Sequence, residues 1–124
     1  MPDLDRKNIG FLAEGLAAKS LESRGYTILD HNYRKPWGEI DIIAEKQEIL
    51  IFVEVKANST HREGFAPEIR AGNEKLRKVL RTAKTYMMDK RYSADQPWQI
   101  DIISVTFNKS TRTAQIKHFK NVTG

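Results

Sequence analysis

The sequence predicts a single α/β domain with a mixed central sheet flanked by helices, and three patterns support this prediction. An amphipathic helical pattern occupies residues 8–24, and two apolar runs within residues 38–56 flank a polar break, as in a β-hairpin. A second helical pattern at 67–90 separates that hairpin from another apolar run at 98–107. Parallel neighbouring strands need a long crossover of this kind, so we expect the strands before and after the second helix to be parallel.

Composition narrows the class of protein and of partner. The 124 residues are 40% hydrophobic, which is ordinary for one globular domain spanning 1–124, with 1–7 as a polar, flexible tail. The net charge of +5 favours an anionic partner, most often nucleic acid. The chain has no cysteine, which excludes disulfides and zinc–thiolate sites. The polar start of the sequence leads to no long apolar segment, so we expect no secretory signal, no bilayer-spanning stretch and a cytoplasmic protein without a membrane partner.

The first helix, at residues 8–24, carries an apolar stripe and is followed by Gly25, a suitable helix stop. Glu14 falls at the edge of that stripe, where a solvated surface acid is the simplest interpretation. A short strand at 26–34, with a polar bend at 30–32, should follow. Residues 34–38 form a basic, aromatic turn that contains Arg34 and Lys35 and is either an ordinary solvated loop or a binding loop.

The hairpin at 38–56 contains charged residues inside its apolar runs. Asp41 interrupts the first run, Glu54 interrupts the second, and Lys56 follows two residues later on the same strand face as Glu54. A turn centred on residues 47–48 would place Asp41 opposite Glu54, about 5 Å apart at Cβ. A turn centred on 46–47 would place Glu39 opposite Glu54 instead. In both registers two acids and one lysine converge at one end of the hairpin.

The second half of the chain continues with a polar loop from residue 57 to 67 and the helix at 67–90, which begins at Pro67. Many lysines and arginines crowd the polar positions of this helix, either as a solvated face or as a track for phosphates. Strands at 98–107 and 113–119 complete the chain. Asp101 lies inside the first of these strands, and we expect a structural role for it, with a backbone or arginine partner.

The acids of the hairpin suit a hard cation. Two carboxylates a few ångströms apart can hold Mg²⁺ or Mn²⁺, with water and phosphate oxygens filling the other positions. Such an ion polarises a phosphodiester and helps to generate the attacking nucleophile. Lys56 would orient the water and stabilise charge on the phosphate rather than act as a base. Glu14 could complete the metal shell, and plain salt bridges are the alternative interpretation of the whole cluster.

The order and spacing of Asp41, Glu54 and Lys56 resemble the motif of the PD-(D/E)xK nuclease superfamily. The chain as a whole resembles the YraN-type family of small restriction-endonuclease-like proteins. The matching pieces, in order, are Gly10-x-x-Ala13-Glu14-x-x-Ala17, Gly25-Tyr26, Pro36, Gly38-Glu39-Ile40-Asp41, Phe52-Val53-Glu54-Val55-Lys56 and Lys75. The resemblance implies a restriction-endonuclease-like αβββαβ core. It also implies a metal site at Asp41, Glu54 and the Val55 carbonyl, with Lys56 catalytic and Glu14 assisting.

Two functions are compatible with this resemblance. The first is a metal-dependent endonuclease that hydrolyses phosphodiester bonds in DNA, with branched or damaged DNA as candidate substrates. The second is a nucleic-acid-binding accessory factor in recombination, repair or DNA uptake that keeps the fold but does not cleave. For either function we expect nucleic-acid contacts from the basic residues Arg34, Lys35, Arg62, Lys75 and Lys78. A homodimer is common among junction-cleaving relatives and is left open here, as is a pure protein-interaction module.

Overall fold

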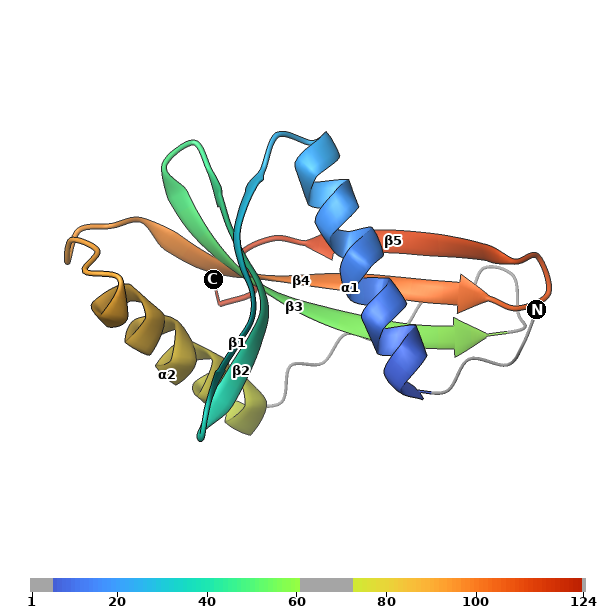
Figure 1. Ribbon diagram of the computed structural model, residues 1–124, viewed down its shortest axis with the longest axis horizontal. Helices are drawn as coiled ribbons and strands as arrows, with labels where there is room; N and C mark the ends of the chain where they lie inside the picture. Colours follow the sequence, from blue (N-terminus) through green and yellow to red (C-terminus); the bar gives the residue numbers. More distant parts are fainter. Residues whose placement is uncertain (1–5, 61–72, 124) are drawn as a thin grey trace.

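The computed structural model describes residues 6–60 and 73–123, which form two helices and one five-stranded sheet (Figure 1). The helices are α1 (Arg6–Ser23) and α2 (Asn73–Asp89). The strands are β1 (Thr27–Lys35), β2 (Gly38–Lys46), β3 (Ile49–Thr60), β4 (Trp98–Asn108) and β5 (Thr113–Phe119). This order confirms the predicted α/β class and the αβββαβ core, to which β5 adds an edge strand.

The sheet is mixed, as the long crossover predicted. Its strands lie in the order β1-β2-β3-β4-β5. The pairs β1–β2, β2–β3 and β4–β5 are antiparallel, whereas β3 and β4 are parallel and are connected through α2. The β1–β2 arm bends away from the other three strands, and α1 crosses the front of those strands in Figure 1.

The β2–β3 hairpin has the first of the two predicted registers. Lys46 pairs with Ile49 and Ile42 pairs with Val53, which leaves Gln47 and Glu48 as a two-residue turn. Both turn residues have positive φ, 52° and 66°, as a type I′ turn requires. Asp41 and Glu54 therefore occupy the next opposed position beyond the paired residues, and the register that opposes Glu39 to Glu54 is wrong.

Each helix covers one side of the sheet, and β3 supplies alternate side chains to both layers. Val53 is fully buried in the cluster that packs beneath α1. Phe52 is fully buried in the cluster that packs against α2, where its ring meets Tyr86 edge-on at 5.9 Å between centroids. This alternation matches the continuous apolar run of β3, because a strand buried on both faces needs apolar residues at every position.

The first helix and the first strand depart slightly from their predicted bounds. Helix α1 begins at Arg6 rather than residue 8, and residues 1–5 of the predicted tail lie outside the described chain. Strand β1 is continuous over the predicted bend, where the irregularity is limited to a positive φ of 50° at Asn32 and a register shift between Ile28 and Asp30. Because Lys35 pairs with Gly38, the predicted basic loop is a tight hairpin turn.

The largest difference concerns β3, which is longer than predicted. Residues 57–60 were expected to begin a polar loop, but they continue β3 and pair in parallel with residues 105–108 of β4. Residues 58–60 are polar, so they are held in the strand by pairing with the backbone of β4 rather than by an apolar pattern. The rest of the predicted loop, with His61, Arg62 and the predicted helix start at Pro67, falls in the range 61–72 that the structure does not describe.

Helix α1 ends as Gly25 predicted. The Tyr26 amide donates to the Leu21 carbonyl and the Gly25 amide to the Glu22 carbonyl, while Gly25 has a φ of 88°. These two bonds form a Schellman C-cap, for which glycine is the favoured residue. Across 6–60 and 73–123, neither helix combines the length and apolar character needed to cross a bilayer.

Candidate metal centre and its basic surroundings

Asp41 is held at the point where β2 leaves β3. Its Oδ2 accepts a hydrogen bond of 2.7 Å from the Val55 backbone amide, just beyond the last paired residues of the two strands. The side chain thus satisfies a backbone donor that a continued ladder would have used. Because the N–H and C=O of one strand residue project to the same edge, the Val55 carbonyl also faces the β2 side.

Three carboxylates converge around this position. Glu14 of α1 and Glu39 and Asp41 of β2 each offer an oxygen, and these oxygens all lie within 4.8 Å of one another. Glu14 and Asp41 are half-buried, whereas Glu39 is exposed. An all-oxygen donor set of this kind suits Mg²⁺ or Mn²⁺, so the residues present fit the divalent cation that the sequence predicts.

The carboxylates of this centre hold negative charges close to one another, and this changes the pKa of Asp41. Burial, together with the negative charges of Glu14, Glu39 and Glu54, raises the pKa of Asp41 to about 7. The hydrogen bond from the Val55 amide lowers the pKa and only partly opposes these effects. A bound cation would favour the ionised form of Asp41 and so offset both burial and repulsion.

Glu54 has a different partner. Its side chain is only 13% exposed, and one of its carboxylate oxygens contacts the ammonium of Lys75, in the first turn of α2. Glu54 is close enough to raise the pKa of Asp41, yet its carboxylate is held on the α2 side of the cluster. The half-buried Lys56 follows on β3, and strand alternation places it on the same face as Glu54.

The predicted nucleic-acid residues occupy different parts of this surface. Arg34 pairs with Glu39 at 3.4 Å, next to the carboxylates. Lys35 pairs with Asp89 at 3.3 Å, at the C-terminal end of α2 and away from Lys75 at its start. Lys78 is exposed on α2, and Arg62 lies in the undescribed range.

Exposed cations crowd α2, and we call this set of residues the α2 basic face. Its members are exposed and cationic: Lys75, Arg77, Lys78, Arg81 and Lys84. Arg81 lies over the ring of Trp37, with its guanidinium 4.5 Å from the ring centroid. This contact joins the turn between β1 and β2 to the α2 basic face.

Glu39 is the site residue that sequence reasoning missed. Period-two alternation puts Glu39 and Asp41 on the same strand face, so the signal was present. The sequence placed Glu39 opposite Glu54 in the register that proved wrong, and within the Gly38-Glu39-Ile40-Asp41 match, but did not predict it as a metal ligand. Its approach to Glu14 depends on how α1 crosses the sheet, which no local pattern specifies.

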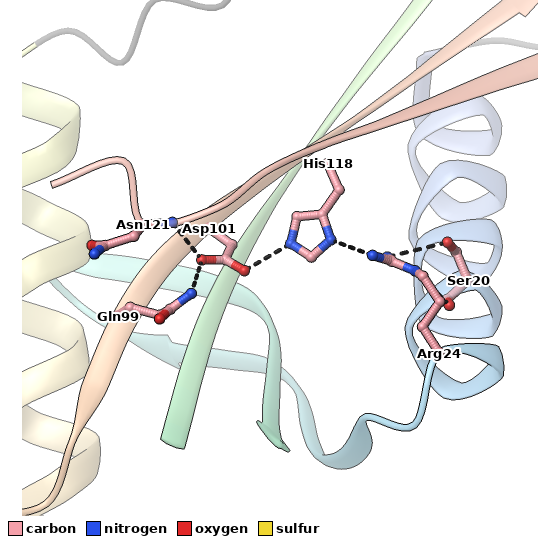
Figure 2. Close-up of polar contacts among 6 residues, drawn as sticks. All are labelled: Ser20, Arg24, Gln99, Asp101, His118 and Asn121. Atoms are coloured by element: carbon pink, nitrogen blue, oxygen red, sulfur yellow. Dashed lines mark hydrogen bonds and ion pairs between the residues drawn. The ribbon is translucent and has the colours of Figure 1, made fainter. Parts of the chain in front are cut away.

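A second polar cluster lies beneath α1 and joins three elements (Figure 2). Asp101 of β4 is fully buried, and its Oδ2 lies 2.7 Å from Nε2 of His118 on β5. The other ring nitrogen of His118 lies 2.8 Å from Nη1 of Arg24. Because arginine can only donate, Nδ1 of His118 accepts and Nε2 carries the proton that is donated to Asp101.

Asp101 also accepts bonds of 2.8 Å from the Gln99 side chain and from the Asn121 amide. Burial raises its pKa, but the bonds from His118, Asn121 and Gln99 outweigh burial and leave the pKa below its ordinary value. The predicted structural role with a backbone partner is confirmed, whereas the predicted arginine is reached only through His118.

Comparison with known proteins finds relatives over nearly the whole chain. The sequence model described as "Uncharacterised protein family UPF0102" matches residues 13–105. A UPF0102 protein of Campylobacter fetus subsp. fetus is 41% identical over 113 residues, covering 91% of this chain and 91% of that protein. One from Fervidobacterium nodosum is 39% identical and covers 90% of this chain and 78% of its own length. Another, from Syntrophotalea carbinolica, is 38% identical over 92% of this chain and 89% of its own.

Proposed function

This chain belongs to the UPF0102 (YraN) family, and from that membership and the Asp41 centre we propose that it is a metal-dependent endonuclease acting on DNA. The proposal rests on one observation. Carboxylate oxygens from α1 and β2 converge within 4.8 Å at the strand position where Asp41 accepts the Val55 amide. Glu54 and Lys56 lie on the adjoining strand, in the order that the PD-(D/E)xK resemblance requires.

In this proposal the protein's own groups prepare the site. Asp41 is oriented by the Val55 amide, and the Val55 carbonyl, Glu54 and Glu14 are the other groups that would hold the cation. Glu39 adds a further carboxylate from the same strand. Bound Mg²⁺ or Mn²⁺ would polarise the phosphodiester and lower the pKa of a bound water. Lys56 would orient that water and stabilise the negative charge that develops on the phosphate.

The α2 basic face supports a nucleic-acid substrate. Its five exposed cations extend along the helix from Lys75, which touches Glu54, to Lys84. Such a row can follow a phosphate backbone, and its contribution to binding should weaken as salt is raised. We propose DNA as the substrate, with branched or damaged DNA as the forms to test first and a homodimer as an assembly to test.

A second candidate function is favoured by the Lys75 contact. With its carboxylate engaged by an ammonium, Glu54 resembles a structural ion pair more than an open metal ligand. A chain in which that pair persisted would bind DNA through the α2 basic face without cleaving it. This is the accessory-factor function in recombination, repair or DNA uptake.

Cleavage of plasmid and four-way-junction DNA with Mg²⁺ or Mn²⁺ distinguishes the two functions. Wild type, Glu54→Ala and Lys56→Ala should be compared, with Glu45→Ala on β2 as the matched control distant from Asp41. Metal-dependent cutting that is lost in the first two variants and kept in the control supports the nuclease. Salt-sensitive binding without cutting, unchanged in both site variants, supports the accessory factor and contradicts the nuclease.

A further inference from the structure

We propose that Lys75 is an exchangeable counter-ion: it neutralises Glu54 until a divalent cation binds, and it then contacts a substrate phosphate. This inference rests on the proposed metal site and adds a role for a residue of α2. It makes Lys75 a positioning residue that couples cation binding to nucleic-acid binding.

The first step of the inference is the asymmetry of burial within the ion pair. The Glu54 side chain is 13% exposed, whereas the Lys75 side chain is 58% exposed. A carboxylate so far removed from water needs a cationic partner, because an unpaired buried charge is strongly unfavourable. The ammonium that supplies this partner is itself mostly in solvent, so it can leave without uncovering a buried charge of its own.

The second step is competition for the same carboxylate. A divalent cation that uses Glu54 together with Asp41 must approach the group that the Lys75 ammonium already contacts. Two positive charges beside one carboxylate repel each other. Cation binding and the Lys75–Glu54 ion pair therefore oppose each other, and the cation must displace the ammonium.

The third step is where the displaced ammonium goes. Lys75 and Lys78 are three residues apart on α2, so their side chains are neighbours on the helix surface. Once released from Glu54, the Lys75 ammonium can bind a phosphate together with the rest of the α2 basic face, beside the metal centre. A phosphate bound there would hold Lys75 away from Glu54, and by linkage it would strengthen cation binding by the same factor that the cation strengthens phosphate binding.

The other ion pair at the centre does not combine a mostly buried acid with an exposed cation. Arg34 pairs with Glu39 at 3.4 Å, but the two side chains are 72% and 40% exposed. Solvent and salt screen such a pair, so its contribution to the charge balance is small. Of these two pairs, only Lys75–Glu54 combines an acid that is mostly removed from solvent with an exposed cation.

The test is calorimetric titration of Mn²⁺ into the full-length protein without DNA. Lys75→Gln should bind Mn²⁺ about fivefold or more tightly than wild type, because the competing ammonium is gone. Lys75→Arg, which keeps the charge, should restore wild-type affinity. Lys109→Gln removes an equal charge from the exposed turn between β4 and β5 and should leave the Mn²⁺ affinity near that of wild type.

A second arm of the titration adds a DNA duplex. DNA should tighten Mn²⁺ binding in wild type, and it should do so less in Lys75→Gln. If wild type binds Mn²⁺ but Lys75→Gln binds it equally or more weakly, the exchange is overturned while the metal site stands. If wild type binds no Mn²⁺ under conditions in which it is folded, the metal site and the exchange both fail.

Discussion

The backbone amide of Val55 donates a hydrogen bond of 2.7 Å to the carboxylate of Asp41, which lies across the hairpin from it. The bond fixes one carboxylate oxygen, and it orients the side chain relative to the strand that carries Glu54 and Lys56. A ligand held by the backbone of a sheet needs little rearrangement when a cation binds, and such preorganisation favours binding.

Asp41 should make the metal-free protein less stable as pH rises. Its pKa is about 7 in the folded chain against an ordinary value of 3.8, so the folded state binds the proton more tightly than the unfolded state does. Stability from this group is fully present below pH 3.8 and is lost as pH rises through about 7.

Urea unfolding in EDTA across this pH range measures the effect. Asp41→Asn cannot ionise but can still accept from Val55, so it should escape the loss and exceed wild type above pH 7 by up to roughly 4 kcal/mol. Parallel stability profiles for wild type and variant would contradict this assignment.

Glu39 should contribute to cation affinity although it is exposed. Glu39→Gln removes one of the three convergent carboxylates and should weaken Mn²⁺ binding about tenfold, in the range typical of groups that support a metal site. Glu45→Gln is the matched control, because Glu45 lies on the same strand near the hairpin turn. Equal affinities for the two variants, measured by calorimetry, would show that Glu39 is only a surface acid.

Gly38 should not tolerate a side chain. A Cβ there would lie 2.5 Å from Oγ1 of Thr82, which is fully buried and donates to the Lys78 carbonyl at 2.7 Å. Gly38→Ala must therefore push α2 away from β2, and we expect it to lower the free energy of unfolding by about 1–3 kcal/mol.

Gly15→Ala is the opposite case and serves as the control for Gly38→Ala. Nothing lies within 4 Å of a Cβ at Gly15, which is inside α1. The substitution should raise the free energy of unfolding by about 0.5–1 kcal/mol, through helix propensity alone. Denaturant unfolding of both variants checks the pair, and a neutral Gly38→Ala would contradict the close packing of α2 on β2.

His118 should be important for stability. His118→Ala removes the donor to the fully buried Asp101 and the acceptor for Arg24, which should cost about 2–4 kcal/mol. His31→Ala changes an exposed histidine of β1 and should stay within about 0.5 kcal/mol of wild type. Nitrogen NMR of the His118 ring should also show the proton on Nε2, and a proton on Nδ1 would contradict the Arg24 contact.

Much of the fold was predictable because local patterns determine it. The apolar run of β3, the glycine stop of α1 and the long crossover before β4 each have a direct physical meaning, and the structure agrees with all three. The hairpin register was left between two alternatives because Gln47 and Glu48 lack the asparagine or glycine that marks a type I′ turn. The end of β3 was missed because residues 58–60 are polar and owe their strand conformation to pairing with β4.

The site was less predictable than the fold, because its contacts join residues far apart in the sequence. Asp41, Glu54 and Lys56 share one hairpin, so strand alternation and pairing predict that they lie near one another. Glu54 does lie close enough to Asp41 to raise its pKa. The Lys75–Glu54 contact depends on how α2 docks, and the Arg24–His118 contact spans 94 positions. Sequence periodicity carries no information about such pairs.

The most direct test of the metal centre is a crystal of the full-length protein grown with Mn²⁺ and measured at the manganese absorption edge. We predict an anomalous peak within about 2–2.3 Å of an Asp41 carboxylate oxygen, with the Val55 carbonyl and Glu54 or Glu14 among its ligands. Asp41→Asn should lose this peak under the same conditions. A wild-type crystal without a peak at Asp41, or with its peak elsewhere on the surface, would contradict the account.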